Sequence, residues 1–157
     1  LKHNFFWGQR EWPYKNVKPR IIAEPYLENS KGDLRDYKFF TFNGKVKALF
    51  IASQRWNKDE TRFDFFDAKG EFLPFTNGHP NADSKPELPV CFDEMKQLAA
   101  KLADRIPEVR VDFYEINGKV YFGEMTFFHW SGMKPFVPEE WDYIFGSWID
   151  IDSIRKE

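Results

Sequence analysis

The chain has 157 residues, a formal net charge of -2 and a hydrophobic fraction of 42%, with 18 Phe and 6 Trp. This length and composition predict one folded domain with a sizeable core and argue against disorder. The nearly balanced charge favours neither a nucleic acid nor an anionic membrane as a partner. No run of residues approaches the roughly 18 apolar residues of a membrane span. The single cysteine, Cys91, excludes an internal disulfide and favours a reducing, cytoplasmic setting.

The first third of the chain predicts an isolated strand followed by a hairpin. Residues 21–27 (IIAEPYL) form a strand candidate that a proline interrupts, which is typical of a hinge. Residues 34–42 and 45–53 are two apolar runs around the Asn-Gly pair at 43–44. Asn-Gly between apolar runs is a strong signal for a β-hairpin.

The middle of the chain predicts a strand, a long loop and the clearest helix. Residues 61–66 (TRFDFF) form the strand, and residues 68–89 carry several turn formers and four of the ten prolines. Loops of that length are usually functional or mobile. Residues 92–106 show an apolar stripe at helical spacing, with Asp93 as the expected N-cap and Pro107 as the stop.

The last third predicts a second hairpin and a second helix. Residues 109–116 and 119–128 flank another Asn-Gly pair, and a proline precedes the short amphipathic stretch 139–148. The expected total is five to seven strands, mostly antiparallel, with two main helices. The fold class is therefore α+β.

The turn of the second hairpin decides which acids share a face, because side chains alternate along a strand. A two-residue turn places Asp112 and Glu124 on opposite faces. A three-residue loop pairs Ile116 with Val120 and sets Asp112 directly opposite Glu124. We prefer the second register because it gathers the apolar side chains on one face and Arg110, Asp112, Glu124 and Thr126 on the other.

Two carboxylates directly opposite each other repel, and the repulsion grows with desolvation. A cation between Asp112 and Glu124 would offset it. Arg110 is one candidate for that cation. A divalent metal is the other, since Mg²⁺ typically binds one or two carboxylates together with substrate phosphates.

The first hairpin carries a lysine in an unusual place. With the same three-residue loop, Lys38 shares a face with Asp36, Phe40 and Phe50, so a cation lies on a largely apolar face. Such a lysine either reaches out to solvent or contacts a phosphate or carboxylate. Arg55 follows the hairpin and suits bidentate recognition of the same groups.

Three stretches, taken together, resemble the C-terminal half of an ATP-grasp enzyme of the TupA-like branch. They are IIAEPYLE (21–28), RDYKFFTFNGKVKALFIASQR (35–55) and VRVDFYEINGKVYFGEMTFFHWSG (109–132). The resemblance covers about residues 10 to 150. It rests on the order and spacing of these strings, because each string alone is a weak signal.

The resemblance implies a nucleotide site. Glu24 is similar to the hinge acid that holds the nucleotide, and the backbone of Tyr26 and Leu27 would lie along the adenine edge. Lys38 matches the basic strand position that faces the phosphates. Arg55 matches a basic residue near phosphate or substrate, so Lys38 and Arg55 are the expected catalytic cations.

The resemblance also implies a magnesium site. Asp112 and Glu124 match the acidic pair that holds Mg²⁺ in this superfamily. Thr126 stands where many members have an Asn as third ligand, so a hydroxyl or a water would replace that ligand here.

The implied function is the ATP- and Mg²⁺-binding portion of a cytoplasmic carboxylate–amine ligase that forms an acyl-phosphate. Its pathway would be bacterial surface-polysaccharide biosynthesis, with a small-molecule or saccharide carboxylate and an amine donor as substrates. Residues 1–20 would end a preceding lid and N-terminal region, and 21–157 would form the C-terminal domain. Without that lid, we expect the 157 residues alone to show little ligase activity. The alternative is a glycosyltransferase-associated or sugar-nucleotide-binding module.

Overall fold

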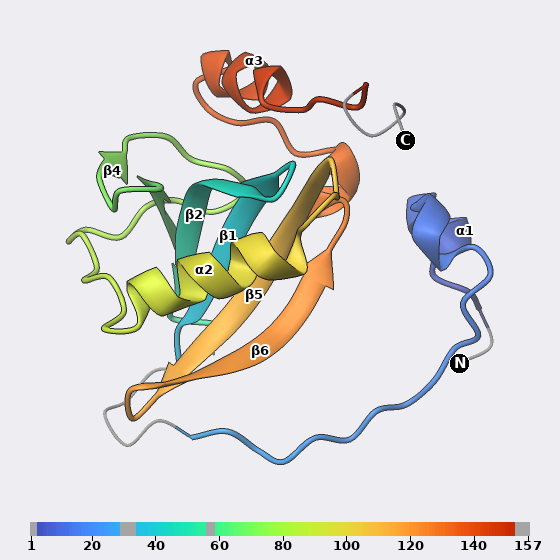
Figure 1. The fold of residues 1–157 in the computed structure, drawn as a ribbon, viewed down its shortest axis with the longest axis horizontal. Coiled ribbons are helices and arrows are strands. Elements are labelled where there is room, and N and C mark those ends of the chain that lie inside the picture. Colours follow the sequence, from blue (N-terminus) through green and yellow to red (C-terminus); the bar gives the residue numbers. More distant parts are fainter. Residues whose placement is uncertain (1–2, 29–33, 56–58, 153–157) are drawn as a thin grey trace.

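The computed structural model describes residues 3–28, 34–55 and 59–152. It contains one six-stranded antiparallel sheet in the order β4-β3-β2-β1-β5-β6 (Figure 1). The strands are β1 (Asp36–Phe42), β2 (Lys45–Ser53), β3 (Arg62–Asp67), β4 (Phe72–Leu73), β5 (Glu108–Ile116) and β6 (Lys119–Thr126). The helices are α1 (Phe6–Gln9), α2 (Phe92–Leu102) and α3 (Glu140–Ser147), with 3-10 turns at Trp12–Tyr14 and His129–Gly132. The α+β class and the antiparallel sheet are as expected.

Three local expectations were wrong. Residues 21–27 form no strand; Ile21 and Ile22 are 82% and 79% exposed, so no neighbouring strand or core supports the segment. The main helix ends at Leu102, four residues before the expected end. Asp93 makes no capping hydrogen bond and instead pairs with Lys96 at 3.0 Å.

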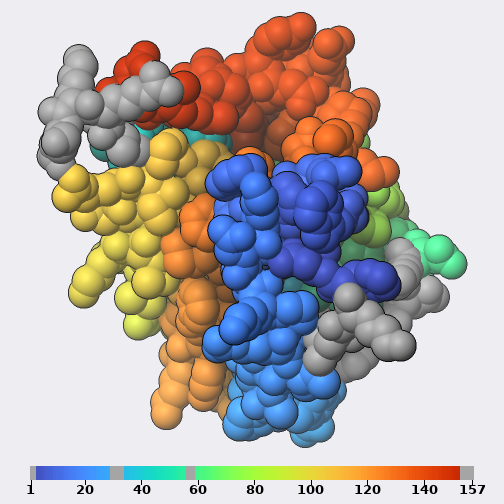
Figure 2. All heavy atoms as spheres, turned by 90° about the vertical axis from the view of Figure 1, so that its right-hand side faces the viewer, coloured from blue at the N-terminus to red at the C-terminus, as the bar shows by residue number. Residues whose placement is uncertain are grey.

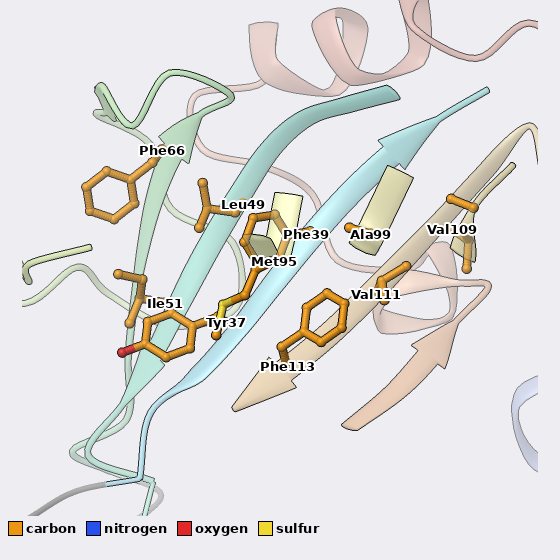
Figure 3. Close-up of a cluster of buried hydrophobic side chains, with 11 residues drawn as sticks. Tyr37, Phe39, Leu49, Ile51, Phe66, Met95, Ala99, Val109, Val111 and Phe113 are labelled. Carbon is orange, nitrogen blue, oxygen red and sulfur yellow. The ribbon is translucent and has the colours of Figure 1, made fainter. Parts of the chain in front are cut away.

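One face of the sheet packs against α2 (Figure 3). Phe39, Leu49 and Val111 come from the three central strands and are fully buried there. Met95 and Ala99 lie four residues apart on α2, so one helix face supplies both. Each large apolar side chain buried in this way contributes about 1.5–3 kcal/mol.

The opposite face of the sheet packs against α3 through a largely aromatic layer. Phe40 and Phe50 come from β1 and β2, and Phe145 comes from α3. The rings of Phe40 and Phe145 meet edge to face with centroids 5.2 Å apart. This aromatic layer covers only part of the face, and the charged residues of β1 and β5 occupy the remainder.

Both hairpins close with a two-residue turn, so the expected three-residue loop was wrong. Phe42 pairs with Lys45 in the first hairpin, and Ile116 pairs with Lys119 in the second. The Asn and Gly of both turns have positive φ, at 49° and 72° in the first and 53° and 73° in the second. Two successive positive φ angles are the signature of the type I′ turn that Asn-Gly favours.

A β-bulge then shifts the register of each hairpin by one residue. In the second hairpin the bulge lies between the pairs Phe113–Phe122 and Val111–Met125, so Gly123 and Glu124 together face Asp112. Beyond both bulges the register is the expected one, with Lys38 opposite Phe50 in the first hairpin. The turns were therefore predicted wrongly, and the faces of the strands were predicted correctly only beyond the bulges. Between the second turn and its bulge, Val120 pairs with Glu115 and not with Ile116, so it lies on the opposite face from the expected one.

The N-terminal segment folds back over the end of β6 (Figure 2). The Asn4 side chain donates to the carbonyl groups of Lys15 and Val17 at 3.0 and 3.1 Å, which closes the segment on itself. The hydroxyl of Ser131 donates to the carboxylate of Glu11 at 2.6 Å, which attaches the segment to the turn after β6. After Val17 the chain runs exposed along the outside of the molecule (Figure 1).

Candidate functional site

Six charged side chains of alternating sign cross the sheet from the end of β2 to β6. We call this set the charge row. In spatial order it consists of Arg55, Asp36, Lys38, Asp112, Arg110 and Glu124. Each cation in the row contacts an anion beside it. Because the row holds three cations and three anions, its six charges sum to zero.

Lys38 lies at the centre of the charge row and does not reach solvent. Its side chain is only 11% exposed, and its ammonium lies 3.1 Å from Asp36. It also donates to Asp112 Oδ2 on the neighbouring strand. A lysine between two almost fully buried carboxylates is held in place by charge, since an unpaired buried charge is very costly. Lys38 therefore contacts two carboxylates of the protein and does not reach out to solvent, whereas its contact with a phosphate stays a prediction.

Arg110 connects β5 to β6. Its Nε and Nη2 donate to the two oxygens of Asp112, both at 2.8 Å, in a bidentate pair. Nη2 also donates to Thr126 Oγ1 at 2.8 Å and to Glu124 Oε1 at 3.1 Å. The guanidinium lies over the ring of Phe50, with its carbon 5.8 Å from the ring centroid. The cation between the two acids is Arg110 in this structure.

Strand pairing explains why these side chains converge. Asp36 and Lys38 alternate along β1, and Arg110 and Asp112 alternate along β5, so each pair points to one face. The register pairs Lys38 directly with Asp112. The bulge at Gly123 then brings Glu124 to the same face. A Cβ at Gly123 would lie 3.1 Å from the carbonyl oxygen of Asp112, so the close approach of the two strands favours glycine there.

The environment of Asp112 keeps it ionised. Burial by itself would raise the pKa of this carboxyl, but the hydrogen bonds and charges of Arg110 and Lys38 outweigh burial and lower the pKa below its ordinary value. Asp36 is equally buried, and its Oδ2 pairs with both Lys38 and Arg55. Burial by itself would lower the pKa of Arg55, but Asp36, Tyr114 and Asp112 together raise it above its ordinary value.

The three expected metal ligands meet at one point, the Nη2 atom of Arg110. They offer two carboxylates and one hydroxyl, the oxygen ligands that Mg²⁺ prefers. Glu124 has a side chain that is 62% exposed and is available to a metal, whereas both oxygens of Asp112 already accept hydrogen bonds. In the described part of the chain, no three His, Cys, Asp or Glu side chains are grouped to hold a metal by themselves. By type, these oxygen donors fit Mg²⁺.

The expected nucleotide-holding residues do not join the charge row in the structure. Glu24, Tyr26 and Leu27 lie in the extended segment after the N-terminal turn, and Tyr26 is 70% exposed. Figure 1 shows this segment running outside the sheet. Lys38 and Arg55, in contrast, meet at the carboxylate of Asp36.

The N-terminal segment brings Tyr14 close to the charge row. Burial is the main cause of its raised pKa, and the negative charges of Glu11 and Glu124 add to the effect while Arg110 opposes it. Tyr14 is thus within electrostatic reach of the β6 end of the row.

A cavity of about 260 Å³ lies beside the charge row under α3. Its walls include Phe40, Phe145 and His129, and Glu108 supplies a carboxylate. Burial raises the pKa of Glu108 to about 7, partly offset by the charge of Arg110. Glu108 was not among the predicted site residues, although it continues the alternation of Arg110 and Asp112 along β5.

Two further polar residues extend the site toward the long loop 68–89. His129 Nδ1 lies 2.7 Å from Arg110 Nη1, and His129 Nε2 lies 2.9 Å from Asn77 Oδ1. His129 was not among the predicted site residues, although it follows the strand that carries Glu124. Asn77 was missed, since Asn77-Gly78 in a loop has the same appearance as an ordinary turn.

Fold and site together define an α+β domain that carries an ionic site on one face of an antiparallel sheet. A family model described as TupA-like ATPgrasp matches residues 1–150. The chain therefore belongs to the TupA-like ATP-grasp family. Membership supports an ATP-binding, ligase-like role.

The other comparisons add no relatives to this assignment. Neither the curated proteins nor the solved structures gave a match. In the described residues, no helix has both the length and the apolar character that crossing a membrane requires.

Proposed function

We propose that the charge row is the ATP- and Mg²⁺-binding site of a carboxylate–amine ligase. The observation that carries the proposal is the convergence of Lys38, Arg110 and Arg55 with Asp36, Asp112 and Glu124 on one face of the sheet. Phosphoryl transfer to a carboxylate requires anionic phosphates to approach an anionic substrate. Cations that are fixed in place once the nucleotide is bound lower that electrostatic barrier without further reorganisation during the reaction.

The binding step would exchange partners within the row. Phosphate oxygens would compete with Asp36 and Asp112 for Lys38. A phosphate contact there would leave one lone pair of Asp112 Oδ2 open to a metal, while Arg110 keeps its hydrogen bonds to both oxygens. Glu124 and Asp112 would hold the Mg²⁺, with Thr126 as a third contact. The metal supplies charge neutralisation for the phosphates when it is bound.

The activated group would be an acyl-phosphate, which the amine then attacks with release of phosphate.

We place the protein in bacterial surface-polysaccharide biosynthesis, in the cytoplasm, with a small-molecule or saccharide carboxylate and an amine donor as substrates. In this proposal residues 1–20 end the lid region and 21–157 form the nucleotide- and metal-binding domain. Glu24, Tyr26 and Leu27 would contact the nucleotide only if their segment moves against the sheet.

Calorimetric titration with a non-hydrolysable ATP analogue tests the proposal. Binding should strengthen when Mg²⁺ is added to the wild-type protein. Glu124→Gln keeps the size and the hydrogen-bond acceptor of the side chain but removes the charge, so the Mg²⁺-dependent gain should fall at least tenfold. Asp112→Asn should have a similar effect. Glu71→Gln, a change of an exposed acid far from the row, is the matched control.

Two results would contradict the proposal, the first for the ligase activity and the second for the metal role of Glu124. Binding of sugar nucleotides without binding of the ATP analogue would favour the sugar-nucleotide module. Binding of the ATP analogue that is equally strong with and without Mg²⁺, in both the wild type and Glu124→Gln, would remove the metal role from Glu124.

A further inference from the structure

Asn77 has an amide group whose orientation is fixed by the backbone around it. Its side chain is buried, with a residue exposure of 1%. The Nδ2 atom donates to the carbonyl oxygens of Lys134 and Pro135, both at 3.0 Å. Because both amide hydrogens are used there, the Oδ1 atom points the other way. It lies 2.9 Å from Nε2 of His129, so it can only accept a hydrogen bond from that nitrogen.

His129 is held in one tautomer from both sides. Its Nδ1 lies 2.7 Å from Nη1 of Arg110, and a guanidinium can only donate. Nδ1 therefore accepts, and Nε2 carries the proton that is donated to Asn77. Burial, reinforced by the charge of Arg110, lowers the pKa of His129 to about 3, which leaves the ring neutral. A protonated ring would present an N–H to Arg110 and lose this contact.

The surrounding rings and backbone prevent His129 from turning. The ring of Phe40 meets it edge to face with centroids 5.0 Å apart, and the ring of Phe50 lies at 5.4 Å. The loop beside Asn77 is equally constrained: a Cβ at Gly78, whose φ is +78°, would lie 2.8 Å from the Trp130 ring. Paired backbone hydrogen bonds of 2.9 and 2.8 Å join Thr76 to Val137.

We infer that Asn77 is a positioning residue of the charge row: acting through His129, it fixes the orientation of the Arg110 guanidinium between Asp112 and Glu124. The loop 68–89 thereby influences the charge row through His129. A side chain that orients a ligand-holding group in this way typically changes metal or ligand affinity 10–100-fold when it is removed. The binding consequence rests on the proposed function, whereas the orientation of Arg110 does not.

Nuclear magnetic resonance of the side chains tests the orientation directly. In the wild-type protein, the nitrogen spectrum of His129 should show an unprotonated Nδ1 and a protonated Nε2 from pH 5 to pH 8. The guanidinium N–H signals of Arg110 should be in slow exchange. Asn77→Ala should broaden these Arg110 signals and lower the Mg²⁺-dependent affinity for the ATP analogue about tenfold.

Asn81→Ala is the matched control for the loss of loop contacts. Asn81 belongs to the same loop and donates to the carbonyl groups of Phe63 and Phe75 at 2.7 and 3.1 Å, without a contact to His129. This variant should lose stability like Asn77→Ala while leaving the Arg110 signals and the affinity unchanged.

Two variants of His129 separate positioning from packing. His129→Phe keeps a ring among the aromatic neighbours and removes both nitrogens, so it should reproduce the Asn77→Ala effect. His129→Asn returns an acceptor near Nδ1 and should restore part of the Arg110 signal.

Equal effects of Asn77→Ala and Asn81→Ala on Arg110, or a protonated Nδ1 in the wild type, would overturn the inference. If Arg110 responds as expected but no variant or wild type binds nucleotide, the proposed function fails and the positioning role stands.

Discussion

Lys38→Met is expected to lower the free energy of unfolding by about 3 kcal/mol at pH 7, because removing one partner of a buried ion pair leaves uncompensated charge. Lys38 contacts Asp36 and Asp112, whose side chains are 1% and 2% exposed. The methionine fills nearly the same volume, so the loss reports charge and not packing. Urea unfolding measures it, and the same variant should no longer bind the ATP analogue.

The pH dependence of this loss has a defined sign. Asp112 has a lowered pKa in the folded protein, so its ion pairs stabilise the fold above the ordinary value of 3.8 and are lost as the pH falls through the folded value. The difference between wild type and Lys38→Met should therefore shrink in acid. Lys96→Met is the control: its pair with Asp93 is exposed, and surface pairs contribute about 0.5 kcal/mol or less. A loss in Lys38→Met no larger than this control would show that the row does not hold the sheet together.

Glu108→Gln is expected to raise the free energy of unfolding by about 2–3 kcal/mol at pH 8. Burial raises the pKa of Glu108 from 4.5 to about 7, and no ion pair to its carboxylate occurs in the described ranges. The folded protein consequently binds this proton more tightly than the unfolded chain does. Wild-type stability should fall as the pH rises from about 4.5 to about 7, and the glutamine should remove that fall.

Thermal unfolding between pH 4 and pH 8 checks the Glu108 prediction. Below pH 4.5 the two proteins should have similar stability, because the acid is protonated in both the folded and the unfolded state. Glu71→Gln, at an exposed acid, should follow the wild type at every pH. Parallel curves for wild type and Glu108→Gln across this range would mean that the carboxylate is solvated and not desolvated by the cavity.

The main strands, and their faces beyond the bulges, could be predicted because the determining signals are local. Apolar alternation and the two Asn-Gly pairs identify both hairpins, and the same alternation places Arg110 and Asp112 on one face of β5. The bulges could not be predicted in this way. They depend on how closely β6 approaches β5 at Gly123, which is a property of the packed sheet.

Candidate residues on strands, such as Lys38 and Glu124, could be identified from the sequence and their roles stay predictions, whereas the loop residue Asn77 was missed. Period-two spacing puts Asp36 and Lys38 on one face of β1, and Arg110 and Asp112 on one face of β5. The pairing of β1 with β5, and the bulge that brings Glu124 to the same face, are properties of the packed sheet. Asn77 reaches His129 across 52 positions of sequence, through a loop whose path depends on contacts with residues 134–137. Residues 21–27 have strand-like composition, but the strand would need a neighbour to pair with, and none of the described strands provides one.

Paramagnetic broadening by Mn²⁺ is the most direct test of the charge row as the nucleotide and metal site. Mn²⁺ replaces Mg²⁺ among oxygen ligands, and it broadens the signals of nearby nuclei. In the presence of the ATP analogue, the backbone amide signals of Asp112, Glu124 and Thr126 should disappear first at low Mn²⁺, and Glu124→Gln should abolish this pattern. Broadening centred elsewhere in the molecule, with these three signals intact, would contradict the account.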